Sequence, residues 1–344
     1  MIRGRGLHEE RGAEDDDEMH ATAPCAQDIN EIPWHISAVT PRPVSGKIIG
    51  MKIVCALVAA LMGISSLNAQ VSPHAVAAEL LAADRAFAAA AKQKEIIPAL
   101  TAMFAPDVIA TIGPNIVTGS EKVAEVLKTN PLNTAGRIDW TPARVGLSGD
   151  GTHGFTAGFM TVHRGDGSTQ PLKYLAYWAK VKEGWRVLVY KRSVAKQPPP
   201  AMSVTYVIPK QIARASATIE RDRESLADAE RSFSRDAQTI GLTAAFKKHG
   251  DPQAINLGGP GVAGFLIGNE QIGEGVGTGT PTNSSPLHWG PDQTIIAGSG
   301  DFGITIGYLV QNQPGSDGKP QPRIPFFTIW KRDSPQAAWK YIAE

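Results

Sequence analysis

The chain has 344 residues, of which 42% are hydrophobic and 19% are charged. A chain of this length and composition is globular and long enough to form two hydrophobic cores. Its net charge of +1 gives no support to a nucleic-acid-binding protein or to a strongly acidic partner.

Residues 1–50 hold five basic and nine acidic side chains and show no apolar periodicity, which is typical of disorder. Residues 51–69 follow with a lysine, an apolar run of 15 residues and the pair Asn68-Ala69. This is the layout of a secretory signal peptide, and its apolar run is shorter than the ~20 residues of a permanent membrane span. We expect cleavage after Ala69 and an exported protein, periplasmic or secreted, with no stable membrane span. An uncleaved anchor is the alternative.

An export signal placed after residues 1–50 favours Met51 as the true start, with the preceding residues as a disordered or mis-called upstream extension. The only two cysteines, Cys25 and Cys55, both precede Ala69. The mature chain would therefore have no cysteine, which excludes disulfides, a thiol nucleophile and a thiolate metal site from it.

The rest of the chain contains an internal repeat. The stretch LLAADRAF at residues 80–87 matches LADAERSF at residues 226–233. Later glycines, prolines and tryptophans match in the same order, among them Pro106 with Pro252, Gly119 with Gly268, Trp140 with Trp289, Trp178 with Trp330, and Trp185 with Trp339. Ordered matches along the whole unit indicate a tandem duplication.

The duplication defines two domains of ordinary small-domain size. We place the first at residues 72–195 and the second, more diverged, at residues 218–344. The linker at 196–217 includes three consecutive prolines, so we expect it to be a stiff spacer.

Each unit begins with helices. In the first, residues 73–92 are alanine-rich with leucine and phenylalanine at helical spacing, and a shorter helical segment ends near Pro106. Two short strands and a helix with Ser120 as its N-cap come next. Apolar strands joined by turn sequences such as SGDG and KEG then predict a four-strand meander. The predicted fold class is α+β: two tandem cone-shaped domains, each with N-terminal helices packed on a curved antiparallel sheet.

The second unit differs in the helix after Gly268, which carries glycine at positions 273, 275, 277 and 279. Each glycine costs about 1 kcal/mol in a helix interior, so we expect this helix to be short or frayed, with a mobile loop beyond it. The run matches neither a phosphate loop nor a dinucleotide fingerprint.

These features resemble the nuclear transport factor 2-like superfamily, and within it the SnoaL-like group and bacterial domains of unknown function. The resemblance rests on ADRAF, the W-x-P strand, the SGD turn before GFTAGF, and the hairpin YWAK…GWRV. It implies cone-shaped domains with a pocket between helices and sheet. Some members are isomerases, dehydratases or cyclases, and many bind ligands or have no known activity. Their sheets commonly pair back-to-back, so the duplication implies an intramolecular pseudo-dimer.

A carboxylate lies on the apolar face of the first helix in both copies. Leu80, Asp84, Phe87 and Ala91 share one helix face, and Glu230 occupies the position of Asp84 in the second copy. In a cone this face points toward the pocket, where the acid could serve as general base or bind a ligand. The alternative is a structural carboxylate that accepts hydrogen bonds from a tryptophan, an arginine or a backbone amide. We favour the structural role, because both copies keep the acid while little else polar is shared.

Histidines are the next candidates for chemistry. His153, Phe159 and His163 share one face of a strand, and if that face is concave, a histidine could pair with Asp84 or Asp139 as an acid–base dyad. The second copy lacks both histidines. The spacing supports no metal site, and we expect no cofactor.

Two functions follow from these candidates. The favoured one is a non-catalytic module that binds a small apolar or aromatic ligand in a cone pocket. The alternative is an isomerase- or dehydratase-type enzyme. A weaker third idea is a structural or partner-binding role. The predicted catalytic residues are Asp84, His163 and Tyr174; the predicted ligand-binding residues are Phe87, Trp140, Phe159, Trp178, Glu230, Trp289 and Trp330.

Overall fold

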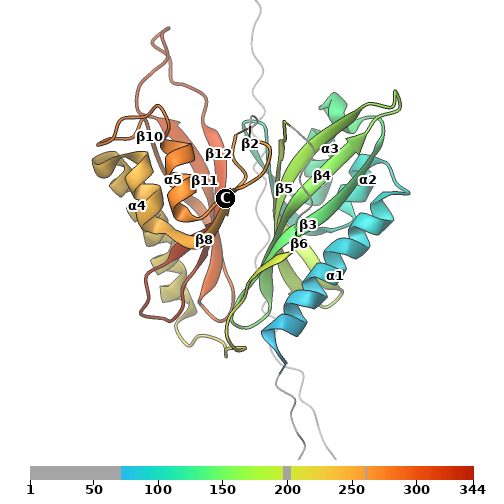
Figure 1. Ribbon diagram of the computed structural model, residues 1–344, viewed down its shortest axis with the longest axis horizontal. Helices are drawn as coiled ribbons and strands as arrows, with labels where there is room; N and C mark the ends of the chain where they lie inside the picture. The colour runs from blue at the N-terminus through green and yellow to red at the C-terminus, as the bar shows by residue number, and fades with distance from the viewer. Residues whose placement is uncertain (1–70, 197–202, 260–261) are drawn as a thin grey trace, which may run out of the picture. The chain divides into compact units, whose positions relative to one another are not determined.

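The computed structural model describes residues 71–196, 203–259 and 262–344 (Figure 1). The expected upstream extension at 1–50 and the expected signal peptide at 51–69 lie outside these residues. Within the described ranges, no helix combines the length and the apolar character that a membrane span requires.

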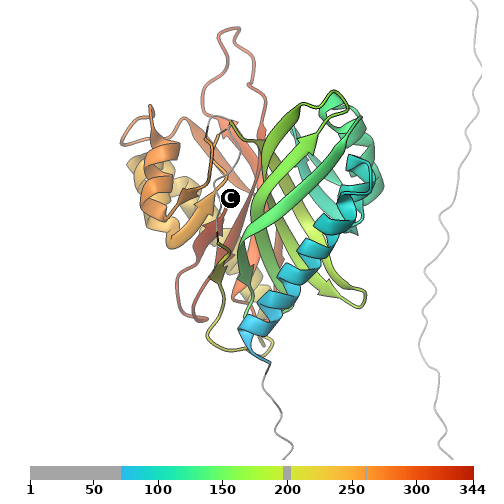
Figure 2. The same cartoon turned by 45° about the vertical axis from the view of Figure 1, so that its right-hand side comes forward.

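The first lobe, residues 73–207, contains three α-helices and one seven-stranded sheet. The strand order is β2-β1-β6-β5-β4-β3-β7. Helix α1 lies across this sheet (Figure 2). The elements are α1 (Pro73–Ala91), α2 (Ile96–Thr101), β1 (Phe104–Ile112), β2 (Asn115–Thr118), α3 (Ser120–Lys128), η1 (Pro131–Asn133), β3 (Arg137–Leu147), β4 (His153–His163), β5 (Thr169–Val181), β6 (Gly184–Val194) and β7 (Thr205–Val207).

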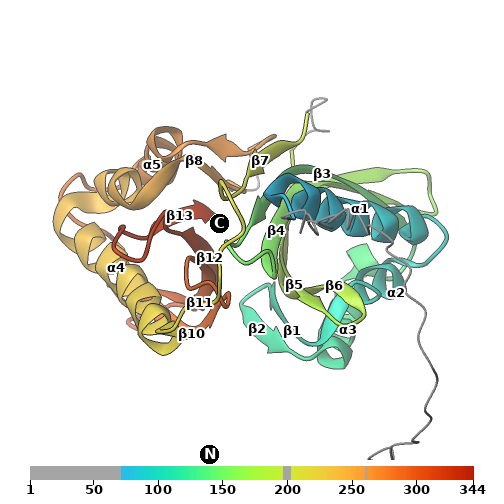
Figure 3. The same ribbon diagram turned by 90° about the horizontal axis from the view of Figure 1, so that it is seen from below.

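The second lobe, residues 219–344, repeats this plan. Its sheet has the order β10-β11-β12-β13-β8-β9, and α4 and α5 flank it (Figure 3). The elements are α4 (Ile219–His249), β8 (Gly250–Asn256), β9 (Leu266–Ile267), α5 (Asn269–Gly277), β10 (Leu287–Ile296), β11 (Phe302–Gln311), β12 (Ile324–Lys331) and β13 (Lys340–Ala343). The predicted α+β class and the tandem repeat are confirmed.

Two local predictions differ from the structure. Helix α3 is capped by Gly119, with a φ of 98°, so Ser120 is its first residue and not its N-cap. The predicted linker contains β7, which pairs in parallel with β3 from Arg144 to Gly146 and so extends the first sheet.

The glycine-rich helix α5 is as long as α3, with nine residues each, contrary to the expectation of a short or frayed helix. Its glycines allow α4 to approach closely. A Cβ atom at Gly273 would lie 2.7 Å from the carbonyl oxygen of Thr243, and one at Gly277 would lie 2.9 Å from the backbone nitrogen of the same residue. Close packing against α4 thus offsets the low helix propensity.

Helix α1 begins where the sequence provides a cap. The Ser72 hydroxyl accepts a hydrogen bond from Ala75 N, and Pro73 occupies the first turn. One face of the helix is then buried on the sheet, with Leu80 and Asp84 both fully inaccessible. The predicted inward face of the first helix is therefore confirmed for these residues.

A separate hydrophobic cluster joins the outer faces of the two sheets. Phe155 of β4 and Phe302 of β11 stack with ring centroids 6.4 Å apart. The strand face that carries Phe155, Ala157 and Phe159 therefore lies against the second lobe and does not face the helices of its own lobe. This corrects the assumption that the face could be concave, because alternate side chains of a strand point to opposite sides of its sheet.

The two lobes also exchange hydrogen bonds at matching turns. Asp150, after β3, accepts a hydrogen bond from Ser299 N (2.8 Å). Asp301, after β10, accepts one from Gly149 N (3.0 Å). Each turn thus supplies a carboxylate to the backbone of the other, in the reciprocal manner of a two-fold interface.

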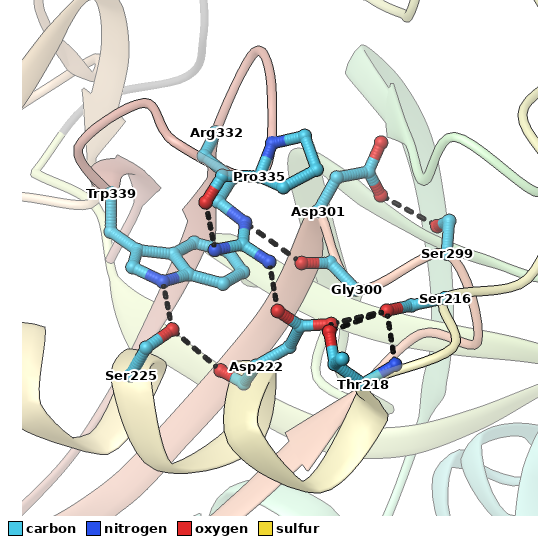
Figure 4. Close-up of polar contacts among 10 residues, drawn as sticks. All are labelled: Ser216, Thr218, Asp222, Ser225, Ser299, Gly300, Asp301, Arg332, Pro335 and Trp339. Atoms are coloured by element: carbon cyan, nitrogen blue, oxygen red, sulfur yellow. Dashed lines mark hydrogen bonds and ion pairs between the residues drawn. The ribbon is translucent and has the colours of Figure 1, made fainter.

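The start of α4 is held to its sheet by a buried ion pair between Asp222 and Arg332 (2.5 Å; Figure 4). Arg332 also donates to Gly300 O (2.9 Å) and Pro335 O (2.9 Å), and the Trp339 ring lies 4.7 Å from its guanidinium carbon. Although burial opposes ionisation, hydrogen bonds from Ser216 and Arg332 keep the pKa of Asp222 below its ordinary value. Each of the three guanidinium nitrogens of Arg332 thus donates a hydrogen bond to an oxygen atom.

We predict that Arg332→Met lowers the free energy of unfolding by about 3–5 kcal/mol, because it leaves the Asp222 carboxylate buried without its cation. The double variant Asp222→Asn/Arg332→Met should recover part of this loss, because no unpaired charge remains. Chemical denaturation measures both. Equal losses in the single and double variants would contradict the role of the ion pair.

Candidate functional site

Asp84 lies at the centre of the first lobe, and both of its carboxylate oxygens accept hydrogen bonds. Trp140 Nε1 donates to Oδ1 (2.5 Å) and the Tyr174 hydroxyl donates to Oδ2 (2.7 Å). Trp178 Nε1 donates to the hydroxyl of Thr156 (2.8 Å) beside this group. Helix α1 supplies the acid, and strands β3, β4 and β5 supply its surroundings.

Glu230 of α4 has the equivalent place in the second lobe. Trp289 Nε1 donates to Oε1 (2.6 Å), and Oε2 accepts from the Thr305 hydroxyl (2.5 Å) and from Trp330 Nε1 (3.0 Å). The indole of Trp330 also lies 3.0 Å from the Thr305 hydroxyl, so the two donors form one connected group.

The two lobes therefore share an acid, two tryptophans and a threonine, because Thr156 and Thr305 occupy matching positions on β4 and β11. This corrects the view that little polar is shared apart from the acid. The lobes differ at one further position: four residues before the second tryptophan stands Tyr174 in the first lobe and Phe326 in the second. The aspartate accepts from tyrosine, whereas the longer glutamate reaches the threonine.

Burial raises the pKa of both acids. For Asp84, hydrogen bonds from Tyr174 and Trp140 oppose the effect of burial, and for Glu230 those from Thr305 and Trp289 do so. Burial also raises the pKa of Tyr174 well above its ordinary value. The arrangement fixes the long helix of each lobe to its sheet through the indole N–H groups, as the structural interpretation of the acids expects.

The predicted catalytic residues are only partly brought together. Tyr174 contacts Asp84, but His163 lies at the end of β4 with about half of its side chain exposed and bonds to Asp139. No hydrogen bond or ion pair joins His163 to Asp84. His153 lies against the ring of Tyr177 (5.7 Å), on the outer face of the sheet.

The predicted ligand-binding residues divide into three groups. Trp140 and Trp178 surround Asp84, and Phe87 lies 6.1 Å from Trp178 as part of the same packing. Phe159 is on the outer face and packs on Phe265 (4.8 Å). The remaining three belong to the second lobe: Glu230 and Trp289 line a cavity, and Trp330 donates to the same carboxylate.

This second-lobe cavity has a volume of about 390 Å³. That size lies within the range of small-molecule pockets. Its apolar wall comes from Phe233 of α4 and from the strands β10 to β12, with Trp289, Leu309, Pro325 and Phe326. In the first lobe, to which the predicted catalytic residues belong, the four side chains around the acid are at most 4% exposed.

The polar wall of the cavity adds residues that the sequence did not indicate. Lys191 and Ser193 of β6 come from the first lobe, and Asn256 and Glu344 from the second. Burial raises the pKa of Glu344 to about 7 although Lys191 opposes it, and burial lowers the pKa of Lys191 to about 8. Strand alternation from Val189 could have placed Lys191 on the outer face, but only the packing of the lobes brings it to this cavity.

Lys173 of β5 holds one side of the same cavity. Its ammonium group donates to the carbonyl oxygens of Leu257, Val262 (2.8 Å) and Gly264 (3.1 Å). Leu257 and the next residue, Gly258, line the cavity. A buried lysine of the first lobe thus fixes a cavity wall of the second.

Two other hollows are less suited to an apolar ligand. One of about 340 Å³ lies beside His163 and Asp139 and is lined by Lys92, Arg137 and Arg164. The other, of about 680 Å³, follows the segment after β7 and is lined by charged residues such as Lys210 and Asp301. Among the residues whose positions are given, no three His, Cys, Asp or Glu side chains are grouped to hold a metal ion.

No family model and no curated protein matches the chain. Several solved structures match part of the chain. A ketosteroid isomerase-like protein from Erwinia carotovora atroseptica is 19% identical, with a TM-score of 0.30, and the match covers 35% of this chain and 97% of that one. A nuclear transport factor 2-like protein of unknown function from Shewanella oneidensis is 11% identical, with a TM-score of 0.29 and coverages of 34% and 97%.

A second nuclear transport factor 2-like protein of unknown function, from Pseudomonas putida, is 15% identical, with a TM-score of 0.30 and coverages of 36% and 89%. The matched structures thus include members of the superfamily that the sequence resembles. Each match takes in about one third of this chain.

We predict that Asp84→Asn changes how stability depends on pH. A carboxyl group whose pKa is raised on folding stabilises the native state most below its ordinary pKa of about 4, and this contribution is lost as the pH rises. The stability of the natural protein minus that of the variant should therefore fall by more than about 1 kcal/mol between about pH 4 and pH 8. Denaturation at a series of pH values measures it.

Glu230→Gln serves as the matched variant in the second lobe and should behave in the same way, because its carboxyl group is equally buried. A stability difference that does not change with pH would contradict the assignment of a raised pKa to Asp84.

Proposed function

We propose that the protein is a binding module that holds a small, largely apolar or aromatic molecule in the second-lobe cavity, without catalysis. The observation that supports this proposal is the cavity itself, which combines aromatic walls with a few polar groups at one side. The proposed site is in the second lobe, which contains three of the predicted ligand-binding residues, Glu230, Trp289 and Trp330.

The composition of the cavity supports an aromatic ligand in particular. Phe233, Trp289 and Phe326 present ring surfaces, and rings favour offset or edge-to-face packing on one another. The acceptor oxygens of Glu230 already receive three hydrogen bonds from the protein. Glu230 therefore serves here as a fixed part of the wall rather than as a base that must meet a substrate.

We predict that the protein binds ethylbenzene and that Leu309→Trp abolishes this binding, because the indole fills the cavity. Isothermal titration calorimetry measures the affinity, and thermal melting checks that the variant is folded. Val181→Trp is the control, because Val181 is an exposed residue of the first lobe and lines none of the cavities described above. Binding by Leu309→Trp as strong as that of the natural protein would refute the site.

One observation favours the alternative, an isomerase- or dehydratase-type enzyme: the hydrogen bond of 2.7 Å between Tyr174 and Asp84. An acid and a phenol in contact can move a proton next to a carbonyl group. Both side chains are at most 1% exposed, however, and a substrate would have to reach them. Under this alternative the protein would exchange the methyl protons of acetophenone in heavy water, and Asp84→Asn and Tyr174→Phe would abolish the exchange.

We propose further that the protein works outside the cytoplasm, because residues 51–69 have the layout of a signal peptide. Expression of the full chain should give an exported form that begins at Gln70. N-terminal sequencing of the exported protein checks this, and a form that begins near Met1 would contradict it.

A further inference from the structure

The second-lobe cavity extends through a gap in its own sheet. Strand β12 pairs with β11 along its whole length, from Ile324 to Lys331. Strand β13 pairs only with Ile329–Lys331 of β12, so the first half of β12 has no partner on that side. In the first lobe the corresponding strands, β5 and β6, pair from Leu172 to Val181, with one register shift between Tyr177 and Trp178.

The gap explains why the cavity has walls from both faces of one sheet. Phe326 and Thr328 line it from the inner face of β12, and Phe327 from the outer face. Behind Phe327 lies β6 of the first lobe, whose Lys191 ammonium group is 4.6 Å from the centre of the Phe327 ring. The cavity therefore ends at two side chains of the first lobe, Lys191 and Ser193.

Within the residues that the structure describes, both side chains are hydrogen-bond donors to which no acceptor is assigned. The Ser193 hydroxyl is buried and has no partner among the residues that the structure describes. Lys191 makes no hydrogen bond to any side chain or carbonyl in the described ranges; its ammonium group lies over the Phe327 ring, and its charge interacts with that of the Glu344 carboxylate. A buried donor without a partner costs free energy, which a ligand oxygen at this place would recover.

Three of the four side-chain carboxylate oxygens of Glu230 and Glu344 already accept hydrogen bonds. Both oxygens of Glu230 accept from tryptophan or threonine, and Glu344 Oε2 accepts from the Asn256 amide (2.8 Å). A ligand that offers donors finds few free acceptors, whereas a ligand that offers an acceptor finds two donors. Glu230 and Glu344 also disfavour a third carboxylate beside them.

We propose that the cavity is a composite site in which Lys191 and Ser193 of the first lobe bind the uncharged carbonyl oxygen of an apolar ligand held by the second lobe. The proposal rests on the proposed function and specifies its ligand class. Under this proposal the covalent connection keeps the two parts of the site together, since neither lobe alone would contain the complete site.

Three probes of similar size test the proposal: acetophenone, ethylbenzene and benzoate. The natural protein should bind acetophenone about tenfold more tightly than ethylbenzene, the scale of one or two added hydrogen bonds, and benzoate most weakly. Lys191→Met and Ser193→Ala should each weaken acetophenone binding and leave ethylbenzene binding unchanged. Isothermal titration calorimetry measures all affinities, and Lys180→Met, outside the cavity, is the control for loss of a lysine.

The outcomes separate this inference from the proposed function. If the natural protein binds none of the three probes, the proposed function fails. If it binds ethylbenzene and acetophenone equally, or if both variants leave acetophenone binding unchanged, the composite site is wrong while the cavity remains a binding site. Tighter binding of benzoate that depends on Lys191 would replace the uncharged carbonyl by a carboxylate and so overturn the proposed ligand class.

Discussion

In each lobe, a buried carboxylate accepts hydrogen bonds from indole N–H groups and so fixes the long helix to the sheet. In both lobes the acid projects from the long helix and accepts a hydrogen bond from a tryptophan on the first long strand of the meander. An acid without partners in such a place would be costly, so the helix has one favourable position on the sheet. The packing of the remaining helix face, and with it the shape of the space between helix and sheet, depends on that position.

The two lobes use this interaction with different side chains. Asp84 is short and meets a tyrosine, so a phenol fills the space next to the acid. Glu230 is one methylene longer and reaches Thr305, and the matching ring, Phe326, has no hydroxyl and lines the cavity. The two lobes thus differ in the acid and in the aromatic ring beside it. The acid of the first lobe lies in a densely packed centre, whereas the acid of the second lobe borders on the cavity. The shorter pairing of β13 with β12 contributes to the same difference.

The sequence predicted the repeat, the α+β class and the inward position of both acids, because these depend on periodicity and on matched residues. It did not predict which lobe holds the cavity, since packing density depends on contacts between residues far apart in the chain. The sequence left the direction of the strand face of Phe155 and Phe159 open for a related reason: alternation shows which residues share a face, but not what covers that face. Likewise, the glycines of α5 indicated a weak helix until the close approach of α4 explained them.

The reciprocal bonds between the turns of Asp150 and Asp301 show that the lobes meet as two copies of one unit would. In a dimer of identical chains every substitution occurs twice, so a mutation that opens one sheet opens both. Here the copies are encoded separately within one chain. One sheet can therefore lose pairing and gain a cavity while the other keeps a dense core and supplies Lys191 and Ser193 to its neighbour. The reciprocal hydrogen bonds remain at the matching turns, whereas the strand pairing beside β12 differs between the two lobes.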